Sequence, residues 1–442
     1  MVAVEDAEES MEYYHKNETL SRDALVALQE IRLRNTLERI RKTDFYRNKL
    51  QDCMVAESCG VENIHLLPFT EKSDLRAQYP TGLLTMPLSQ VERMHASSGT
   101  TGNPTAILYS RNDLNTWADL MARCMYMVGM RSRDIFQNMS GYGLFTGGLG
   151  IHYGAERLGC LTIPAGAGNS RRQIKMLQDF QVSSVHIIPS YALHLSSVFA
   201  EMGIDPRDLS LRVALIGAEP HTEEIRRRIE DFYGIKAYNS YGLSEMNGPG
   251  VAFECQAQDG LHVWEDAYVP EIVDPVTGRP VAEGEVGELV LTSLCREAMP
   301  LLRYRTRDLT RFLPGQCACG RKHRRLDRIL GRCDDMIILK GVNIYPMQIE
   351  KILMSVPEVG ENYVIELVRE EFLESMRVKV EIRAQCFVED MRVLRGLQDR
   401  ITYLLRDEIL ITPRVDLVQP GSLPKSEGKA LRVVDLRAQT QG

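Results

Sequence analysis

The sequence has no long apolar run. None approaches the ~20 residues of a membrane-spanning helix. The first ten residues, MVAVEDAEES, are acidic and lack the basic flank and the apolar stretch of a signal peptide. Both absences predict a cytoplasmic protein without a membrane partner.

The sequence also has no excess of positive charge, because 60 Asp and Glu residues outnumber 53 Lys and Arg residues. Binding to nucleic acid or to an anionic membrane surface requires a basic face, so the net charge of -7 argues against both. The ten cysteines lack the dense regular spacing of a disulfide scaffold. We therefore expect a reducing compartment, in which most cysteines are buried thiols.

Nothing in the composition indicates a disordered or fibrous chain, since 44% of the residues are hydrophobic and 26% are charged. The 442 residues exceed what one hydrophobic core usually serves. The length therefore predicts roughly two or three structural units.

Residues 8–50 have leucine and isoleucine at helical spacing, which predicts helices. Between residues 91 and 240, short apolar runs alternate with amphipathic stretches, which predicts parallel strands joined by crossover helices. Ligands bind at the carboxyl ends of the strands in such sheets. The predicted strands are Thr105–Tyr109, Cys160–Pro164, Ser184–Pro189, Val213–Gly217 and Ile235–Tyr238, and the predicted helices are 111–128, 171–180, 190–202 and 221–233.

The chain changes character after residue 260. Residues 260–312 have short strand patterns separated by turns, which predicts a small β-rich subdomain. A compact αβ tail follows, with helices near 346–356 and 389–409 and strands near 336–339, 362–368, 377–383 and 415–418. The predicted fold class is α/β: a large N-terminal domain with mainly parallel sheets over residues 1–333, and a small α+β domain over residues 334–442.

Two polar segments suit nucleotide binding. The first combines two glycines with four hydroxyl residues, whose N–H and O–H groups can surround phosphate oxygens. It lacks the Gly-Lys-Ser/Thr ending of a Walker A loop, and a polar turn before a strand is the alternative. The second, Asn239 to Glu245, follows an apolar run and offers an amide, a hydroxyl and a carboxylate, the last suited to Mg²⁺; its alternative is a turn with one exposed acid. The first segment consists of Ser97, Ser98, Gly99, Thr100, Thr101 and Gly102.

Several motifs occur in the order found in adenylate-forming acyl-CoA ligases. These are the 97–102 loop, YGLSE at 241–245, YRTRD at 304–308, GRCDD at 331–335 and PKSEGK at 424–429. Four further segments resemble the phenylacetate–CoA ligases within that superfamily: YGLFTGGLG at 142–150, HYGAERLG at 152–159, GAEP at 217–220 and GPG at 248–250. The resemblance extends from about residue 20 to residue 438.

The resemblance implies a reaction in two steps. A carboxylate attacks the α-phosphate of ATP to give an acyl-adenylate and diphosphate, and the CoA thiolate then displaces AMP. The first step brings two anions together, so the site must be rich in donors and cations. The cofactors implied are ATP/AMP, Mg²⁺ and coenzyme A, the substrate is an aromatic acid, and the implied assembly is a homodimer.

The resemblance also assigns roles to residues. Residues 97–102 would hold the β- and γ-phosphates, Ser244 would contact the α-phosphate, and Arg332 would lie near the ribose or a phosphate. Asp308 would accept both ribose hydroxyls, the alternative being a surface acid paired with Arg305 or Arg307. Adenine would be framed by Gly217, Ala218, Glu219 and Pro220 and by Asn239, Ser240, Tyr241 and Gly242.

Two residues are implied to act in catalysis. Glu245 would hold Mg²⁺, and Lys429 would neutralise charge on the carboxylate and the α-phosphate; an exposed lysine without a role is the alternative. The small domain is thought to rotate between the two steps, and Asp334 matches its hinge. Asn103 stands where the family usually has lysine, which predicts weaker ATP binding.

The acid would bind against a third group of residues. Glycines at 147, 148 and 150 would leave room for a flat ring. Ordinary core packing is the alternative for each aromatic member of the group. The implied residues are Tyr142, Phe145, Gly147, Ala218 and Pro249.

Three cysteines and a histidine suit a structural zinc ion. Cys255 and His262 flank an apparent turn, and Cys317 and Cys319 follow some sixty residues later. Three sulfurs and one imidazole are a tetrahedral zinc ligand set. Free thiols are the alternative, and His323 could replace His262. Only some members of the resembling group carry these cysteines.

The sequence therefore predicts an ATP-dependent ligase that joins an aromatic acid, most simply phenylacetate, to coenzyme A. One alternative is an adenylating enzyme that delivers the acyl group to a carrier protein or an amine. Another is a non-catalytic nucleotide-binding regulator, which only Asn103 favours.

Overall fold

The computed structural model describes residues 13–53, 59–97, 104–339, 342–370, 373–386, 390–423 and 432–437. The chain forms two compact units. The first comprises Met1–Ile187, Leu209–Ala218 and Lys236–Ile329, and the second comprises Ile188–Asp208, Glu219–Ile235 and Leu330–Gly442. In the described ranges, no helix combines the length and the apolar character that crossing a membrane requires.

The first unit begins with helices that the leucine spacing predicts. Ser21 accepts a hydrogen bond from the Ala24 N–H and caps helix α2, whose buried face includes Leu33 and Ile40. Thr43 caps helix α3 in the same way. The elements of this region are η1 (Lys16–Thr19), α2 (Arg22–Ile40), α3 (Asp44–Leu50), η3 (Ile64–Leu66), α4 (Lys72–Ala77) and η4 (Leu88–Gln90).

A nine-stranded mixed sheet forms the core of the first unit. Its strand order is β13-β14-β9-β8-β7-β6-β5-β3-β4, with parallel pairing from β4 to β7 and antiparallel pairing beyond β7. The predicted α/β class is confirmed. The strands are β3 (Ile135–Asn138), β4 (Leu161–Ile163), β5 (Ser184–Ile187), β6 (Val213–Gly217), β7 (Lys236–Leu243), β8 (Gly248–Glu254), β9 (Leu261–Val263), β13 (Phe312–Leu313) and β14 (Arg325–Leu326).

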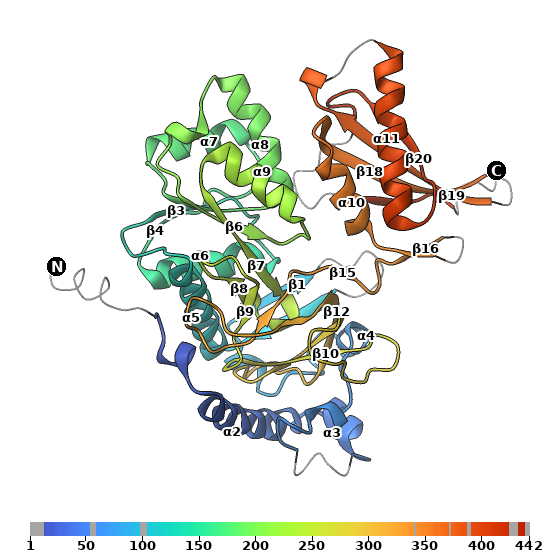
Figure 1. The fold of residues 1–442 in the computed structure, drawn as a ribbon. Helices are drawn as coiled ribbons and strands as arrows, with labels where there is room; N and C mark the ends of the chain where they lie inside the picture. Colours follow the sequence, from blue (N-terminus) through green and yellow to red (C-terminus); the bar gives the residue numbers. More distant parts are fainter. Residues whose placement is uncertain are drawn as a thin grey trace. The chain divides into compact units, whose positions relative to one another are not determined.

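Helices α5 (Arg111–Met127) and α6 (Thr146–Leu158) pack on each other and on β8, and Figure 1 shows them side by side. The close packing depends on glycines of α6. A Cβ at Gly150 would lie 2.0 Å from the Trp117 ring, and one at Gly148 would lie 2.4 Å from the Gly141 carbonyl oxygen. Helix α7 (Ser170–Asp179) follows β4 in the chain.

Two smaller sheets complete the first unit. The hairpin of β1 (Arg93–Ser97) and β2 (Thr105–Tyr109) pairs Ser97 with Thr105, and the predicted phosphate loop connects these two residues. The predicted β-rich subdomain contains β10 (Tyr268–Val273), β11 (Gly287–Ser293) and β12 (Tyr304–Thr310), paired antiparallel in this order.

The second unit contains the C-terminal part of the chain together with α8 (Pro189–Met202), η5 (Pro206–Asp208) and α9 (Glu223–Tyr233). Its four-stranded sheet has the order β20-β19-β18-β21. Arg228 of α9 donates to the Met354 carbonyl oxygen at 2.6 Å. The remaining elements are β15 (Gly331–Arg332), β16 (Ile337–Leu339), β17 (Val342–Ile344), α10 (Pro346–Ser355), β18 (Val359–Glu370), β19 (Leu373–Ile382), η7 (Ala384–Cys386), α11 (Met391–Ile409), β20 (Arg414–Val418) and β21 (Val433–Asp435).

The packing therefore divides the chain after Ile329, close to the predicted boundary. It also assigns α8 and α9 to the second unit, although β5 and β6, the strands that precede them in the sequence, belong to the first unit. The domain limits of 1–333 and 334–442 stay a prediction.

Candidate active site

Strand β7 and strand β12 bring two predicted nucleotide-binding residues together. The Tyr241 hydroxyl donates a hydrogen bond to Asp308 Oδ2 at 2.6 Å, and both side chains are buried. Arg305 and Arg307, on the same strand as Asp308, form ion pairs with Glu288. Asp308 is thus a buried carboxylate held by a phenol.

Most of the 239–245 segment belongs to strand β7, and its last two residues begin a 3-10 turn. β7 continues to Leu243, pairing in parallel with β6 as far as Ser240 and antiparallel with β8 beyond it. The backbone N–H of Asn239 donates to Glu254 Oε2 at 2.7 Å. Gly217 has to be glycine, because its Cβ would lie 2.4 Å from the Ser240 carbonyl oxygen.

A 3-10 turn, η6 (Ser244–Met246), follows β7 and carries Glu245. Its carbonyl groups are held by two buried side chains: the Tyr109 hydroxyl donates to the Ser244 oxygen at 3.3 Å, and Arg296 donates to the Glu245 oxygen at 2.9 Å. The Ser244 hydroxyl lies 3.0 Å from Thr146 Oγ1. The backbone of the turn is therefore fixed from both sides.

The Glu245 carboxylate is buried, and Lys72 Nζ lies 3.7 Å from its Oε1 atom. Lys72 is the first residue of α4 and is about half exposed. A carboxylate oxygen in this setting fits Mg²⁺, which prefers oxygen ligands. The lysine adds a positive charge beside the same carboxylate.

The predicted acid-binding residues cluster around the start of α6. Asn138 Nδ2 donates to the Tyr142 hydroxyl at 3.0 Å and to the Gly148 carbonyl oxygen at 2.8 Å. Burial raises the pKa of Tyr142, so its hydroxyl keeps its proton at neutral pH. Phe145, which precedes α6, is 44% exposed. Asn138 thereby ties Tyr142 to the helix start.

The three glycines of this segment differ in what faces them. The Gly141 carbonyl and the Trp117 ring fill the space beside Gly148 and Gly150, so the protein itself uses the room predicted for a flat ring there. Apart from its chain neighbours and the backbone of its own helix, no atom of the described residues lies within 4 Å of a Cβ built on Gly147. The Trp117 indole N–H also donates to the Pro249 carbonyl oxygen at 2.8 Å.

Other predicted site residues are placed elsewhere or are not described. Ala218 ends the β6 segment in the first unit with a φ of 68°, whereas Glu219 and Pro220 belong to the second unit, where Glu219 accepts a hydrogen bond from the Ser190 N–H at 2.7 Å. Arg332 forms a bidentate pair with Asp334 at 2.9 and 3.0 Å. Ser97 is the last residue of β1. The residues Ser98, Gly99, Thr100, Thr101, Gly102, Asn103 and Lys429 lie outside the described residues.

Sequence reasoning missed the residues that hold this site in place. Arg296, Tyr109 and Thr146 contact the 244–246 turn but lie far from it in the sequence. Lys72 likewise precedes Glu245 by a long stretch of chain. Thr146 lies within the 142–150 motif, which gave it no role, and the other three belong to no motif. One signal in the sequence could have pointed to Arg296. It lies between two short apolar segments, and the structure shows it buried; arginine is seldom buried unless it is paired.

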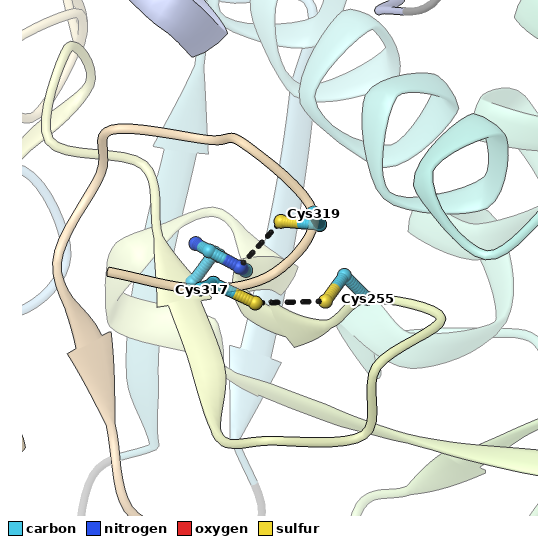
Figure 2. A group of neighbouring side chains, drawn as sticks. Cys255, Cys317 and Cys319 are labelled. Atoms are coloured by element: carbon cyan, nitrogen blue, oxygen red, sulfur yellow. Dashed lines mark hydrogen bonds between the residues drawn. The ribbon is translucent and has the colours of Figure 1, made fainter. Parts of the chain in front are cut away.

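A second site consists of Cys255, His262, Cys317 and Cys319, whose ligand atoms all lie within 4.8 Å of one another (Figure 2). Cys255 follows β8, His262 lies in β9, and the other two belong to the loop before β14. That loop turns at Gly320, whose φ is +80° and whose N–H donates to the Cys317 carbonyl oxygen. Segments distant in the sequence thus converge on one point.

The distances within this cluster fit a metal ion better than a disulfide. Cys255 Sγ and Cys317 Sγ are 3.5 Å apart, and Cys319 Sγ is 3.2 Å from His262 Nε2. A disulfide requires about 2.0 Å, whereas two sulfurs on a tetrahedral zinc ion lie roughly 3.8 Å apart. Hydrogen bonds from Cys255 and then His262 lower the pKa of the Cys319 thiol, whereas the hydrogen bond with Cys319 and burial raise the pKa of the Cys255 thiol.

His262 suits the cluster and His323 does not. His262 Nδ1 lies 3.3 Å from the His323 carbonyl oxygen, so it donates there and leaves Nε2 facing Cys319. Both ring nitrogens of His323 are used by the backbone: Nδ1 accepts from the Glu265 N–H at 3.0 Å, and Nε2 lies 3.1 Å from the Asn17 carbonyl oxygen.

Family models match two parts of the chain: residues 71–295 match the AMP-binding enzyme family, and residues 341–437 match the AMP-binding enzyme C-terminal domain. The chain is 45% identical to a phenylacetate-coenzyme A ligase of Thermus thermophilus, over 97% of this chain and 100% of the relative. It is 46% identical to one of Pseudomonas putida, over 95% and 96% of the two chains. A solved structure of 2-hydroxyisobutyryl-CoA ligase in the postadenylation state, in complex with 2-HIB-AMP, aligns with a TM-score of 0.90 at 28% identity, over 97% of this chain and 94% of that chain.

Proposed function

Because the chain belongs to the AMP-binding enzyme family and, within it, to the phenylacetate-coenzyme A ligases, we propose that it activates phenylacetate with ATP and transfers the acyl group to coenzyme A. The phenylacetate carboxylate attacks the α-phosphate, which releases diphosphate and gives phenylacetyl-adenylate. The CoA thiolate then attacks the acyl carbon and releases AMP. The enzyme is thus an acid–thiol ligase.

The contact between Tyr241 and Asp308 carries the proposal. It joins two of the motifs assigned to the nucleotide, and the Asp308 carboxylate would accept a ribose hydroxyl. Gly217 ends β6 and pairs with Ser240, the last residue of β7 in the parallel pairing, and ligands bind at this edge of such sheets. Residues 97–102 would add donors for the phosphates.

Glu245 would hold Mg²⁺, which neutralises phosphate charge when bound. Lys72 stands beside this carboxylate and would supply a cation next to the triphosphate. Its charge would compensate in part for the neutral Asn103 in the phosphate loop. The negative charge of Glu245 and the positive charge of Lys72 would together determine the net charge beside the triphosphate.

The Asp308→Ala variant is expected to raise the apparent KM for ATP by roughly 10- to 100-fold, because hydrogen bonds to a charged group contribute about 1.5–3 kcal/mol each. Tyr241→Phe removes the donor that orients Asp308 and should give a smaller rise. Diphosphate release at varied ATP and at varied phenylacetate measures both KM values. Asp327→Asn, a change at a partly exposed acid that pairs with Arg311, is the matched control. An unchanged KM for ATP in both test variants would contradict the assignment.

Five residues would contact the acid: Tyr142, Phe145, Gly147, Ala218 and Pro249. The open space at Gly147 and the exposed ring of Phe145 support this assignment, because a flat ring can approach both. The Tyr142 phenol would contribute a neutral donor at the edge of the site.

The C-terminal domain would move between the two steps, with Asp334 at the hinge. The packing divides the chain after Ile329, a few residues before Asp334, and this closeness supports the assignment. A rotation there would change which face of the domain meets the adenylate.

A structural zinc ion would be held by the four residues of the second site: Cys255, His262, Cys317 and Cys319. Four N and S ligands complete a tetrahedron and leave no open position, so the ion would stabilise the fold of the first unit.

An acid panel tests the proposed function directly. Purified protein should release diphosphate with phenylacetate and ATP, and should form a thioester and AMP in turnover only when coenzyme A is present. Hexanoate serves as the aliphatic comparison. Diphosphate release without CoA consumption would favour transfer to a carrier protein or an amine. The absence of diphosphate release with every aromatic acid would favour a nucleotide-binding regulator.

A further inference from the structure

Strand β12 departs from regular pairing at the point where it carries Asp308. Glu288 of β11 pairs with Leu309 of β12. Val290, two residues further along β11, pairs with Arg305, so one residue of β11 lies opposite three residues of β12. Bulges of this kind occur next to active sites, where they turn a side chain in a new direction. The bulged residues are Thr306, Arg307 and Asp308.

Arg307, in the middle of the bulge, has a φ of 67°. A residue with a Cβ adopts this left-handed conformation only at a cost in free energy, so other contacts must stabilise it. The Arg307 N–H donates to Glu288 Oε1 at 3.1 Å. The Glu288 carboxylate thus holds the strained residue that directly precedes Asp308.

The hydroxyl of Thr306 fixes the backbone on the other side of the bulge. It donates to the Leu289 carbonyl oxygen at 2.8 Å and accepts from the Asp308 N–H at 3.0 Å. The Asp308 carboxylate in turn accepts from the Tyr241 hydroxyl at 2.6 Å. The position of this carboxylate therefore depends on the shape of the bulge.

Glu288 belongs to a network of two glutamates and two arginines whose charges balance. Its carboxylate is buried and lies 2.5 Å from Arg305 Nη2 and 3.8 Å from Arg307 Nη1. Glu71 pairs with the same two arginines at 3.6 and 3.2 Å. Because a buried carboxylate must be paired, Arg305 keeps Glu288 in place beside the bulge.

An ion pair that only stabilised the sheet would need no contact with the bulge. Glu271 of β10 is such a case: Arg303 donates to both of its carboxylate oxygens, at 2.9 and 3.0 Å. Glu288 differs, because one of its oxygens also accepts from the backbone N–H beside Asp308. We propose that Glu288 is a positioning residue of the nucleotide site, which maintains the bulge and so places Asp308 against the ribose. The inference rests on the proposed assignment of Asp308 to the ribose.

Isothermal titration of AMP into the full chain tests this role. Glu288→Gln is expected to raise the Kd for AMP by roughly 10-fold, the equivalent of one lost hydrogen bond. The amide oxygen would accept from the Arg305 guanidinium, which leaves the amide NH₂ group against the Arg307 N–H. The KM for ATP should rise to a similar extent, whereas the KM for phenylacetate should not change. Glu271→Gln breaks the comparable buried pair with Arg303 and is the matched control, which should bind AMP as the wild type does.

Arg307→Gly gives a readout that a purely structural ion pair would not affect. Glycine adopts a positive φ without the cost that a Cβ imposes, so the bulge would no longer depend on Glu288. Adding Arg307→Gly to Glu288→Gln should therefore recover most of the affinity for AMP. Adding Arg307→Ala removes the same side chain but keeps the cost, and it should not recover the affinity. Equal recovery by glycine and alanine, or no recovery by glycine, would contradict the inference.

The double variant Glu288→Met with Arg305→Met decides the question if Glu288→Gln does not fold. Replacing both partners of a buried ion pair by apolar side chains is often neutral for stability, because no charge is left without its partner. The double variant too should bind AMP about 10-fold more weakly. If Glu288→Gln, or the double variant in its place, binds AMP as the wild type does, the inference is wrong. A wild type that releases no diphosphate but binds AMP in a Glu288-dependent manner would refute the proposed function alone.

Discussion

Replacing Lys429 with alanine is expected to slow the formation of the acyl-adenylate by roughly 100- to 1,000-fold, the usual cost of removing one electrostatic contact to a transition state. The step places a carboxylate against the α-phosphate of ATP, and the ammonium group would neutralise the charge that develops there. Transfer of the acyl group from preformed phenylacetyl-adenylate to coenzyme A should be nearly unchanged. Diphosphate release and thioester formation, measured separately, distinguish the two steps.

The described residues on each side of Lys429 are held by the sheet of the second unit. The Leu423 N–H donates to Glu381 Oε1 at 2.8 Å, and the Arg432 carbonyl oxygen accepts from the Ile365 N–H at 2.8 Å. Arg432 also lies over the Tyr363 ring, 4.3 Å from its centre. The segment that carries Lys429 is therefore tied at both ends to the sheet of the second unit.

Lys351→Ala is the matched control for Lys429→Ala. Lys351 belongs to the same unit and is 59% exposed, with a distant pairing to Glu408 at 3.7 Å. Its replacement should leave both steps unchanged. An equal loss of both steps in Lys429→Ala would show that the residue supports the fold or the binding of both substrates, and would refute a role confined to adenylation.

Most of the fold could be predicted from hydrophobic periodicity, and the failures have physical causes. Helix α6 was not predicted, because its glycines each weaken an isolated helix by about 1 kcal/mol. In the structure the same glycines allow contact with α5: a Cβ at Gly154 would lie 2.3 Å from Met121 Cβ. Tertiary packing outweighs local propensity there, and one sequence does not reveal which helix face will be approached.

Strand β7 was predicted to end at Tyr238, before the polar residues of the nucleotide motif. It continues to Leu243, because strands on both sides supply backbone partners for a polar segment. Strand β3 was also missed, since its inner residues Gln137 and Asn138 are polar and fully buried. Gln173 accepts a hydrogen bond from the first of these amides at 2.7 Å, through a contact between residues far apart in the chain.

The site could be predicted only where motifs carried it. Asp308 and Tyr241 were both named from motifs, and the structure places them in contact. The alternative for Asp308 was an ion pair with Arg305 or Arg307. The ion pairs that the structure shows for these two arginines are with Glu288 and Glu71. Arg296, which fixes the Glu245 backbone, belongs to no motif and could be found only from the fold.

The Cys319→Ser variant is expected to lose bound zinc, from about one ion per chain to near zero, and to melt roughly 5–10 °C lower. A structural zinc ion contributes folding free energy directly, and each kcal/mol lost shifts the melting temperature of a domain of this size by about 2–4 °C. Metal analysis of the purified protein and thermal unfolding measure both effects. A chelator should lower the wild-type melting temperature by a similar amount.

The contacts around the cluster indicate which part of the chain would be destabilised by the loss of the zinc ion. Tyr13 donates to the Cys319 carbonyl oxygen at 3.2 Å, and the neighbouring Arg321 pairs with the buried Glu18 at 2.7 Å, so the loop of the cluster holds the first described segment of the chain. Losing the ion should therefore expose this segment to protease before the rest of the first unit. Cys386→Ser, a change at a half-buried cysteine of the second unit, is the control for loss of a thiol and should keep both the zinc and the melting temperature. Wild-type protein that contains no zinc, with a melting temperature that neither Cys319→Ser nor the chelator lowers, would show that the four side chains form a cluster of free thiols around a histidine.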